Sequence, residues 1–184
     1  MIIVFTGNGK GKTTAALGQA IRALGQKKRV LMIQFIKGPW KSGEDYFAAK
    51  LKIQLLRSKS PEGHSRFQII KSGKGFVKIL GDKLPFSAHR KAAAAGLKTA
   101  EKAIRSGKWD LIIFDEINVA VGLKLIKAAE VLKILQNLPE TKTVILTGRD
   151  APKSFIKIAD LVTEMKEIKH PFQKNKAAEK GVDF

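Results

Sequence analysis

The apolar residues of this 184-residue chain are grouped in short runs, and longer stretches with helical periodicity lie between the runs. Short apolar runs predict buried strands, whereas apolar residues spaced three and four apart predict one face of a helix. The predicted strands are residues 2–5, 29–35, 109–116, 143–147 and 161–168, with Lys52–Arg57 as a half-exposed or edge strand because its polar and apolar residues alternate. The predicted helices are residues 15–24 with Gly25 as C-cap, 87–106 with Ser87 as N-cap, a helix that stops at Pro139, and 152–159.

Predicted strands and helices alternate along the chain. That order is typical of an α/β fold in which a mainly parallel sheet carries helices on both faces. Between Ser58 and Pro85 the pattern is interrupted by glycine and proline, which predicts a long irregular insertion of the kind that often has a function. With 44% hydrophobic residues and no visible linker or repeat, residues 1–184 are expected to form a single domain.

A glycine-rich turn joins the first predicted strand to the first predicted helix, with the sequence Thr6-Gly7-Asn8-Gly9-Lys10-Gly11-Lys12-Thr13-Thr14. Glycine lets backbone N–H groups turn toward a bound anion, and the helix N-terminus adds a partial positive charge. This pattern predicts a phosphate-binding loop, in which Lys12 reaches the outer phosphates and the Thr13 hydroxyl takes a Mg²⁺ position. The spacing departs from G-x-x-x-x-G-K-[ST], because Thr6 stands at the first glycine position.

Polar residues follow two later strands. Asp115 and Glu116 end the strand at residues 109–116, and Gly148-Arg149 follows the strand at residues 143–147. Ligands of open parallel sheets bind at the carboxyl ends of the strands, so we expect these residues to converge with the phosphate loop. Two carboxylates there could hold hydrated Mg²⁺ or simply cap the next segment. Arg149 is equally compatible with a phosphate contact and with a structural salt bridge.

The chain carries 35 lysine and arginine residues against 16 aspartate and glutamate residues, a formal net charge of +19. That excess is compatible with nucleic-acid binding, but aromatic residues are only 7% and do not interleave with the basic ones as a base-stacking surface requires. A basic surface also suits phosphates and acidic protein partners. Nucleic acid is therefore not the expected partner. Two alternatives remain from the residues alone: a P-loop ATPase acting on nucleic acid, and a small-molecule phosphotransferase.

Several other site types receive little support. There are no cysteines, which fits a reducing interior, and no apolar run approaches the ~20 residues of a membrane span, so a cytoplasmic protein is expected. The three histidines share no metal-ligand spacing, and none is assigned to catalysis. Trp40 and Phe76 sit in predicted loops, where an aromatic ring either covers a flat ligand or anchors the loop, with anchoring favoured from the residues alone.

Taken together, the motifs resemble the ATP:corrinoid adenosyltransferases of the CobA/CobO/BtuR type nearly from end to end. The resemblance is carried by residues 7–14, by Gln34-Phe35-Ile36-Lys37-Gly38 with Trp40 and Gly43-Glu44, by Phe114-Asp115-Glu116-Ile117-Asn118, by Leu146-Thr147-Gly148-Arg149, and by Lys169-His170-Pro171-Phe172 with the final Gly181-Val182-Asp183-Phe184. The shortened phosphate loop is a feature of that family. The resemblance implies a RecA-like P-loop NTPase fold and a homodimer.

The resemblance also implies a reaction. The 5′-deoxyadenosyl group of ATP moves to the reduced cobalt of a corrinoid, and triphosphate is released, with ATP and Mg²⁺ as cofactors and the corrinoid as substrate. Co(I) is itself the nucleophile, so no general base is needed. What is left to the protein is to position C5′ and to stabilise charge on the departing triphosphate. An acidic electron donor such as flavodoxin is expected as a partner.

Site residues follow from the same resemblance, position by position. Lys12 and Lys10 would be catalytic, as cations that face the leaving triphosphate, and Thr13 and Glu116, with Asp115, would hold the metal. The nucleoside side would contact Asn8 and Arg22. The full ATP-binding set is Gly7, Asn8, Gly9, Lys10, Gly11, Lys12, Thr13, Thr14, Arg22 and Arg149, and the corrinoid-binding set is Phe76 and Trp40.

Two departures from the family pattern concern the corrinoid. Family members often carry an N-terminal extension that helps to cover it, whereas this chain begins at the first predicted strand. Many members have Gly-Phe-Thr-Trp where this chain has Gly75-Phe76-Val77-Lys78, so one aromatic residue near the expected corrin face is missing. Neither departure concerns the residues that are expected to bind ATP.

Overall fold

A computed structural model describes residues 1–57, 66–79 and 81–182. Its centre is a sheet of six parallel strands in the order β3-β2-β4-β5-β1-β6. The strands are β1 Ile2–Thr6, β2 Val30–Gln34, β3 Phe67–Lys71, β4 Leu111–Asp115, β5 Thr143–Thr147 and β6 Leu161–Glu164. The helices are α1 Lys12–Gly25, α2 Gly43–Arg57, α3 Phe86–Arg105, α4 Ile117–Gly122, α5 Ala128–Leu135 and α6 Lys153–Ile158, with a 3-10 turn, η1, at Pro171–Lys174.

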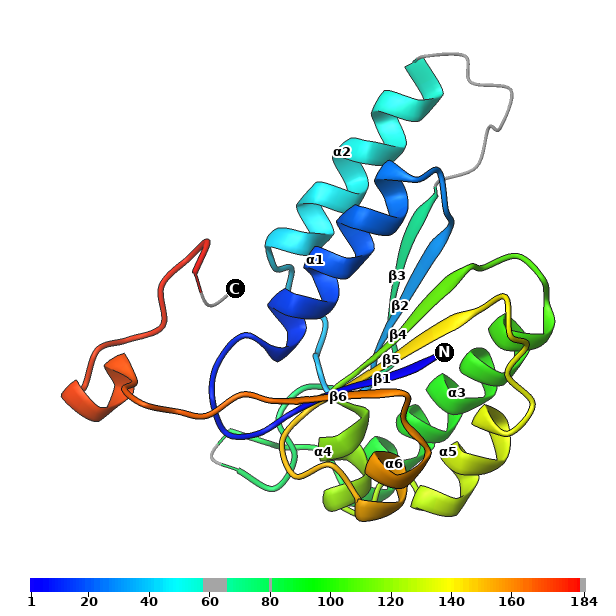
Figure 1. Ribbon diagram of the computed structural model, residues 1–184. Helices are drawn as coiled ribbons and strands as arrows, with labels where there is room; N and C mark the ends of the chain where they lie inside the picture. The colour runs from blue at the N-terminus through cyan, green and yellow to red at the C-terminus, as the bar shows by residue number, and fades with distance from the viewer. Residues whose placement is uncertain (58–65, 80, 183–184) are drawn as a thin grey trace.

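Helices cover both faces of the sheet, as predicted. In Figure 1, α1 and α2 lie on one face, and α3, α4, α5 and α6 lie on the other. Two hydrophobic clusters correspond to these two layers, one between the sheet and α1 with α2, the other between the sheet and the four remaining helices. All five residues of β2 and of β4 are buried, because a central parallel strand is covered on both sides.

The register between β2 and β4 places the polar residues at the ends of these two strands side by side. Ile33 on β2 pairs with Phe114 on β4, and the next pair is Gln34 with Asp115. These two polar side chains are fully buried although they end apolar strands. Buried polar groups need hydrogen-bond partners, so their partners define the chemistry at this edge of the sheet.

Most predicted elements are confirmed within a few residues, and β5 has the predicted bounds. Four predictions were wrong. Gly25 is not the C-cap of α1, because the helix includes Gly25 and its cap is Gln26. The expected edge strand at Lys52–Arg57 is the last part of α2. The sequence alternates there, but the helix starts upstream, where the backbone N–H and the hydroxyl of Ser42 donate to Asp45 Oδ2 at 2.8 and 3.0 Å. That local start signal, together with the packing of Ala48 and Leu51 against the core, favours a helix over the whole segment.

The other two corrections lie between Ser58 and the start of α3. The predicted insertion is not wholly irregular, because Phe67–Lys71 forms β3, which pairs with β2 as the edge strand; residues 58–65 and 80 lie outside the described residues. Ser87 is not the cap of α3, since the helix begins at Phe86 after Pro85, and no side chain caps it. The short helix α4 directly after Glu116 was not foreseen.

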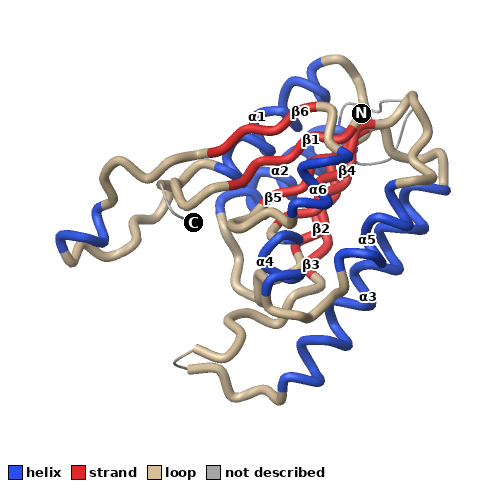
Figure 2. The backbone as a smooth tube through the Cα atoms, turned by 60° about the horizontal axis from the view of Figure 1, so that its bottom comes forward, coloured by secondary structure: helices blue, strands red, loops and turns tan. Residues whose placement is uncertain are grey.

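Beyond β6 the chain leaves the sheet, turns at η1 and comes back, as Figures 1 and 2 show. Its last described residues, Gly181 and Val182, therefore lie against the carboxyl edge of the sheet. Within residues 1–57, 66–79 and 81–182, no helix is both long enough and apolar enough to cross a membrane.

Candidate active site

The phosphate loop occupies the turn from β1 to α1. Gly7 and Gly11 have φ values of +94° and +113°, which favour glycine. The loop packs tightly on the segment after β6: the Gly9 N–H donates to Met165 O at 2.7 Å, and a Cβ on Gly9 would lie 2.7 Å from Lys166 O. The glycines are thus required both by backbone conformation and by a close approach of two backbone segments.

In front of this loop is a cavity of about 450 Å³ at the carboxyl edge of the sheet. Its lining comes from the phosphate loop and α1, the segment after β2, the start of α2, the residues that follow β4 and β5, and the C-terminal segment: Lys10, Gly11, Lys12, Thr13, Thr14, Leu17, Lys37, Gly43, Glu44, Glu116, Arg149, Gly181 and Val182. The predicted convergence of the phosphate loop with Glu116 and Arg149 is confirmed. The cavity brings lysine and arginine together with two carboxylates, so it is suited to an anion accompanied by a cation.

Lys12 is the most buried of the cavity's cations. Its residue is only 8% exposed, and Nζ donates to the carbonyl oxygen of Gly9 at 2.5 Å. Burial lowers the pKa of Lys12, an effect that the negative charge of Glu116 opposes and the positive charge of Arg149 reinforces. An anion bound in the cavity would favour the charged form of this lysine.

Asp115 lies behind the cavity wall and is fully buried. Its Oδ1 accepts hydrogen bonds from the hydroxyls of Thr13 and Thr147, both at 2.8 Å, and its Oδ2 accepts one from Gln34 Nε2 at 3.3 Å. Burial raises the pKa of Asp115, and these hydrogen bonds act in the opposite direction. Asp115 is not among the residues that line the cavity, so it reaches the cavity through Thr13.

Glu116 does line the cavity. Its backbone φ is +60°, and its N–H donates to Thr147 Oγ1 at 2.9 Å, a geometry that lets β4 turn sharply into α4. Burial raises the pKa of Glu116 to about 7; the charge of Asp115 adds to this effect, and Lys12 and Arg149 oppose it. A buried carboxylate beside a second carboxylate is stabilised by a bound cation. With the Thr13 hydroxyl on the same cavity, the oxygen donors present fit Mg²⁺.

A polar cluster that the sequence reasoning did not assign to any role lies on the β2 side of the cavity. Glu44 Oε1 accepts a hydrogen bond from Gln34 Nε2 at 3.1 Å and forms an ion pair with Lys37 Nζ. Burial alone would raise the pKa of Glu44, but hydrogen bonds from Lys37, the backbone and Ser42 hold that pKa at about 2. A sequence signal was available, because Gln34 is a polar residue at the end of an apolar strand.

Two predicted site residues are not part of the cavity wall. Asn8 is exposed at the tip of the phosphate loop, and Arg22 is exposed on α1, more than two turns beyond Lys12. Neither residue lines the cavity. Any contact of these side chains with a ligand would involve a part of that ligand that extends out of the cavity.

The predicted aromatic residues form a pair on the surface. The ring centroids of Trp40 and Phe76 are 6.1 Å apart, and the two residues are 64% and 61% exposed. A Cβ on Gly38 or on Gly75 would lie 2.7 or 2.9 Å from the Trp40 ring, so the indole rests on glycine backbone. Two loops are anchored by this contact, and two aromatic rings are still left open to solvent.

Lys78, which stands where many family members have tryptophan, is directed to a different ring. Its ammonium lies 4.4 Å from the ring centroid of Phe86 at the start of α3. The loop between them is held by Asp82, which accepts hydrogen bonds from the backbone of Lys78 and Leu84 and lies 3.1 Å from His89 Nε2. His89 thus has a carboxylate partner that helps to hold this loop against α3.

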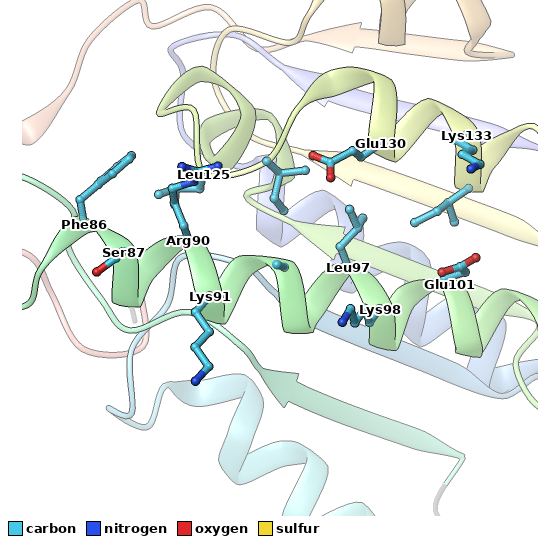
Figure 3. A pocket seen from close by; sticks show the side chains of 13 residues that line it. Phe86, Ser87, Arg90, Lys91, Leu97, Lys98, Glu101, Leu125, Glu130 and Lys133 are labelled. Atoms are coloured by element: carbon cyan, nitrogen blue, oxygen red, sulfur yellow. The ribbon is translucent and has the colours of Figure 1, made fainter.

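A larger cavity, of about 740 Å³, lies between α3 and α5 on the opposite face of the sheet from α1 (Figure 3). Leu97 and Leu125 point into it, with Arg90, Glu130 and Lys133 around them. Neither the phosphate loop nor a strand end contributes to its lining. The smaller cavity at the strand ends is therefore the candidate active site, because it combines the phosphate loop with carboxylates.

Comparison with known proteins gives one consistent result. The family model described as ATP:corrinoid adenosyltransferase BtuR/CobO/CobP matches residues 1–184. The corrinoid adenosyltransferase of Escherichia coli K12 and the corrinoid adenosyltransferase CobA of Salmonella typhimurium LT2 are each 34% identical over 184 residues, which is all of this chain and 85% of each relative. A corrinoid adenosyltransferase of a Sinorhizobium species is 35% identical over 185 residues, with 80% of the relative covered.

Proposed function

Since the chain belongs to the family of ATP:corrinoid adenosyltransferases, we propose that the cavity at the strand ends binds the triphosphate of ATP while the Trp40–Phe76 pair receives the corrinoid. The reaction is transfer of the 5′-deoxyadenosyl group of ATP to the corrinoid cobalt. The observation that supports the triphosphate assignment most strongly is the convergence of Lys10, Lys12 and Arg149 on one cavity at a helix N-terminus.

The chemistry needs positioning and charge stabilisation rather than proton transfer. The electron pair of Co(I) forms the bond to C5′ of the ribose, and the C5′–O bond breaks with its electron pair leaving on triphosphate. Cations placed around the triphosphate before the reaction stabilise that departing charge. Lys12 and Lys10 are proposed for this role, with the loop amides and Arg149 as further phosphate contacts.

Mg²⁺ is proposed to bind at Thr13 and Glu116. It would supply positive charge to the triphosphate, and its remaining ligands would be phosphate oxygens and water. Asp115 acts through Thr13, because its carboxylate is occupied by three hydrogen bonds inside the protein. Its part is to fix the direction of the Thr13 hydroxyl, as the groups behind metal ligands commonly do.

The corrinoid is proposed to lie against Trp40 and Phe76. Their rings are exposed, close together and attached to loops at the same edge of the sheet as the triphosphate cavity. Trp40 thereby supplies a second aromatic ring beside Phe76. A large exposed apolar surface on two anchored loops is typical of a ligand site.

Further parts of the assignment are proposals on the same basis. Asn8 and Arg22 would contact the nucleoside where it extends out of the cavity. The chain is proposed to work as one domain of residues 1–184, as a homodimer, in the cytoplasm, with an acidic electron donor such as flavodoxin. The net charge of +19 favours an acidic partner.

One product assay tests the proposed function. The protein is mixed with ATP, Mg²⁺ and chemically reduced cobalamin or cobinamide, and the phosphate products are separated. We expect triphosphate in equal amount to adenosylated corrinoid, and a rate lower on the order of 10²–10³-fold for Lys12→Ala. Formation of ADP would instead indicate a phosphotransferase. A Lys12→Ala variant that retained more than half of the rate at saturating ATP would remove Lys12 from the site.

A further inference from the structure

Lys37 extends from the end of β2 into the lining of the triphosphate cavity. In the sheet, β2 is separated from the strand of the phosphate loop, β1, by β4 and β5. Lys37 therefore approaches the cavity from a different direction than Lys10 and Lys12 do. Its side chain is 34% exposed, and its ammonium is paired with Glu44, whose side chain is only 9% exposed.

Glu44 is itself held from inside the protein. The Nε2 group of Gln34 lies 3.1 Å from Glu44 Oε1 and 3.3 Å from Asp115 Oδ2, and Gln34 is fully buried. The orientation of this amide is determined by its surroundings, because its carbonyl oxygen would otherwise face two carboxylates. A continuous chain of hydrogen bonds thus joins Lys37 to Asp115, the residue that holds Thr13.

We propose that Lys37 is a further triphosphate-binding cation, which Glu44 and Gln34 position at the β2 side of the cavity. The inference rests on the proposed triphosphate site and extends it. Glu44 lines the same cavity, so its negative charge would face the anion if no cation lay beside it. With Lys37 on that side, positive charge lies at both ends of the anion, and Glu44 is a positioning residue that orients the lysine before the ligand arrives.

An ordinary structural ion pair would explain the same contact, but it predicts a different response to mutation. If the pair only anchors the loop that carries Trp40, loss of either partner loosens that loop and weakens ligand binding. If Lys37 binds triphosphate, removal of its charge weakens binding, whereas removal of the Glu44 charge strengthens it. Glu44→Gln keeps an oxygen that can accept from Gln34 and Lys37, so it changes charge with little change of shape.

The test is isothermal titration of inorganic triphosphate with Mg²⁺ into the protein of residues 1–184 and its variants. We expect Lys37→Met to weaken binding about 10–100-fold and Lys37→Arg to stay much closer to the wild type. Glu44→Gln should tighten binding roughly threefold to tenfold. The matched control is Lys41→Met: Lys41 is an exposed lysine of the same loop that does not line the cavity, and its loss should change affinity less than about twofold.

Two results would overturn the role of Lys37: equal affinities for Lys37→Met and Lys41→Met, or weaker binding in both Lys37→Met and Glu44→Gln. Lys12→Ala separates this failure from failure of the site as a whole. If the wild type binds triphosphate and Lys12→Ala does not, the cavity is the triphosphate site whatever Lys37 does. If Lys12→Ala binds as tightly as the wild type, the triphosphate lies elsewhere and both assignments fall. Thermal unfolding of each variant, without ligand, checks that it is folded.

Discussion

The Thr13 hydroxyl donates a 2.8 Å hydrogen bond to Asp115 Oδ1, which joins the first turn of α1 to the last residue of β4. The two residues are 102 positions apart in the sequence. Thr147 at the end of β5 donates to the same oxygen, also at 2.8 Å. One buried carboxylate therefore fixes three elements that surround the proposed triphosphate site, and it orients the hydroxyl that we assign to Mg²⁺.

Replacement of Asp115 by asparagine should lower both stability and activity. The new amide group is a donor that would face hydrogen-bond donors in a fully buried position. We expect the free energy of unfolding to fall by about 1–3 kcal/mol, measured by urea denaturation. Asp150→Asn is the control, because Asp150 is exposed with φ +51°, a conformation that asparagine tolerates, and its change should be below about 0.5 kcal/mol. Equal stabilities of the two variants would contradict the structural role of Asp115.

Glu116→Gln should alter the Mg²⁺ requirement more than any other property. The amide keeps the size of the side chain but removes the negative charge that a cation needs. We expect the Mg²⁺ concentration for half-maximal adenosyl transfer to rise about tenfold or more. Glu101→Gln, on α3 at the opposite face of the sheet, should leave this concentration unchanged. An unchanged Mg²⁺ titration for Glu116→Gln would exclude this residue from the metal site.

Two glycine-to-alanine variants should change different properties, one the affinity for ATP and the other the stability of the fold. In Gly9→Ala the new Cβ would lie 2.7 Å from Lys166 O and 2.8 Å from Met165 O, both backbone atoms, so the phosphate loop has to shift. ATP binding should be lost or strongly reduced in an equilibrium titration. Gly18 lies within α1 with no atom near its Cβ position, so Gly18→Ala should raise stability by about 0.5–1 kcal/mol with ATP affinity unchanged. Wild-type ATP affinity in Gly9→Ala would show that the close approach is not needed.

Glu44 should make stability depend on pH in the acidic range. Its pKa is held at about 2 in the folded protein, below the ordinary value of 4.5. A depressed folded pKa stabilises the protein above pH 4.5, and that contribution is lost as the pH falls toward 2. Glu44→Gln should therefore cost about 1–2 kcal/mol at pH 7, and its difference from the wild type should shrink steadily below pH 4.5. Urea denaturation at several pH values, with exposed Glu140→Gln as control, measures this; a difference independent of pH would refute it.

Phe76→Ala should lower adenosylation that starts from the Co(II) corrinoid more than adenosylation of the Co(I) corrinoid. An apolar ring against the corrin favours displacement of the lower axial ligand of Co(II), which makes the cobalt easier to reduce. We expect a large loss of adenosylation when the assay starts from Co(II) and a much smaller loss with pre-formed Co(I). Trp40→Ala should show the same preference, because the two rings are neighbours. Equal losses in the two assays, or none in either, would leave Phe76 without a part in ligand displacement.

Local sequence patterns determined most of the elements and half of the site. The apolar run at Thr143–Thr147 gave a strand with the bounds observed, and the glycines before Lys12 identified the phosphate loop, because both features depend on neighbouring residues only. The same dependence explains the failures. Six alternating residues at Lys52–Arg57 do not distinguish an edge strand from the end of a helix whose start signal, Ser42 with Asp45, lies upstream.

The tertiary structure alone decided which side chains meet. Gln34 and Asp115 are in contact because β2 and β4 are neighbours in the sheet, and strand order depends on how the helices pack rather than on either strand's own residues. Because β2 lies beside β4, Asp115 is buried behind Thr13. The same strand order also places Lys37 and Glu44 beside the phosphate loop, which no spacing in the sequence indicates. A sequence determines which residues can bind phosphate, but only the packed sheet determines from which directions they reach it.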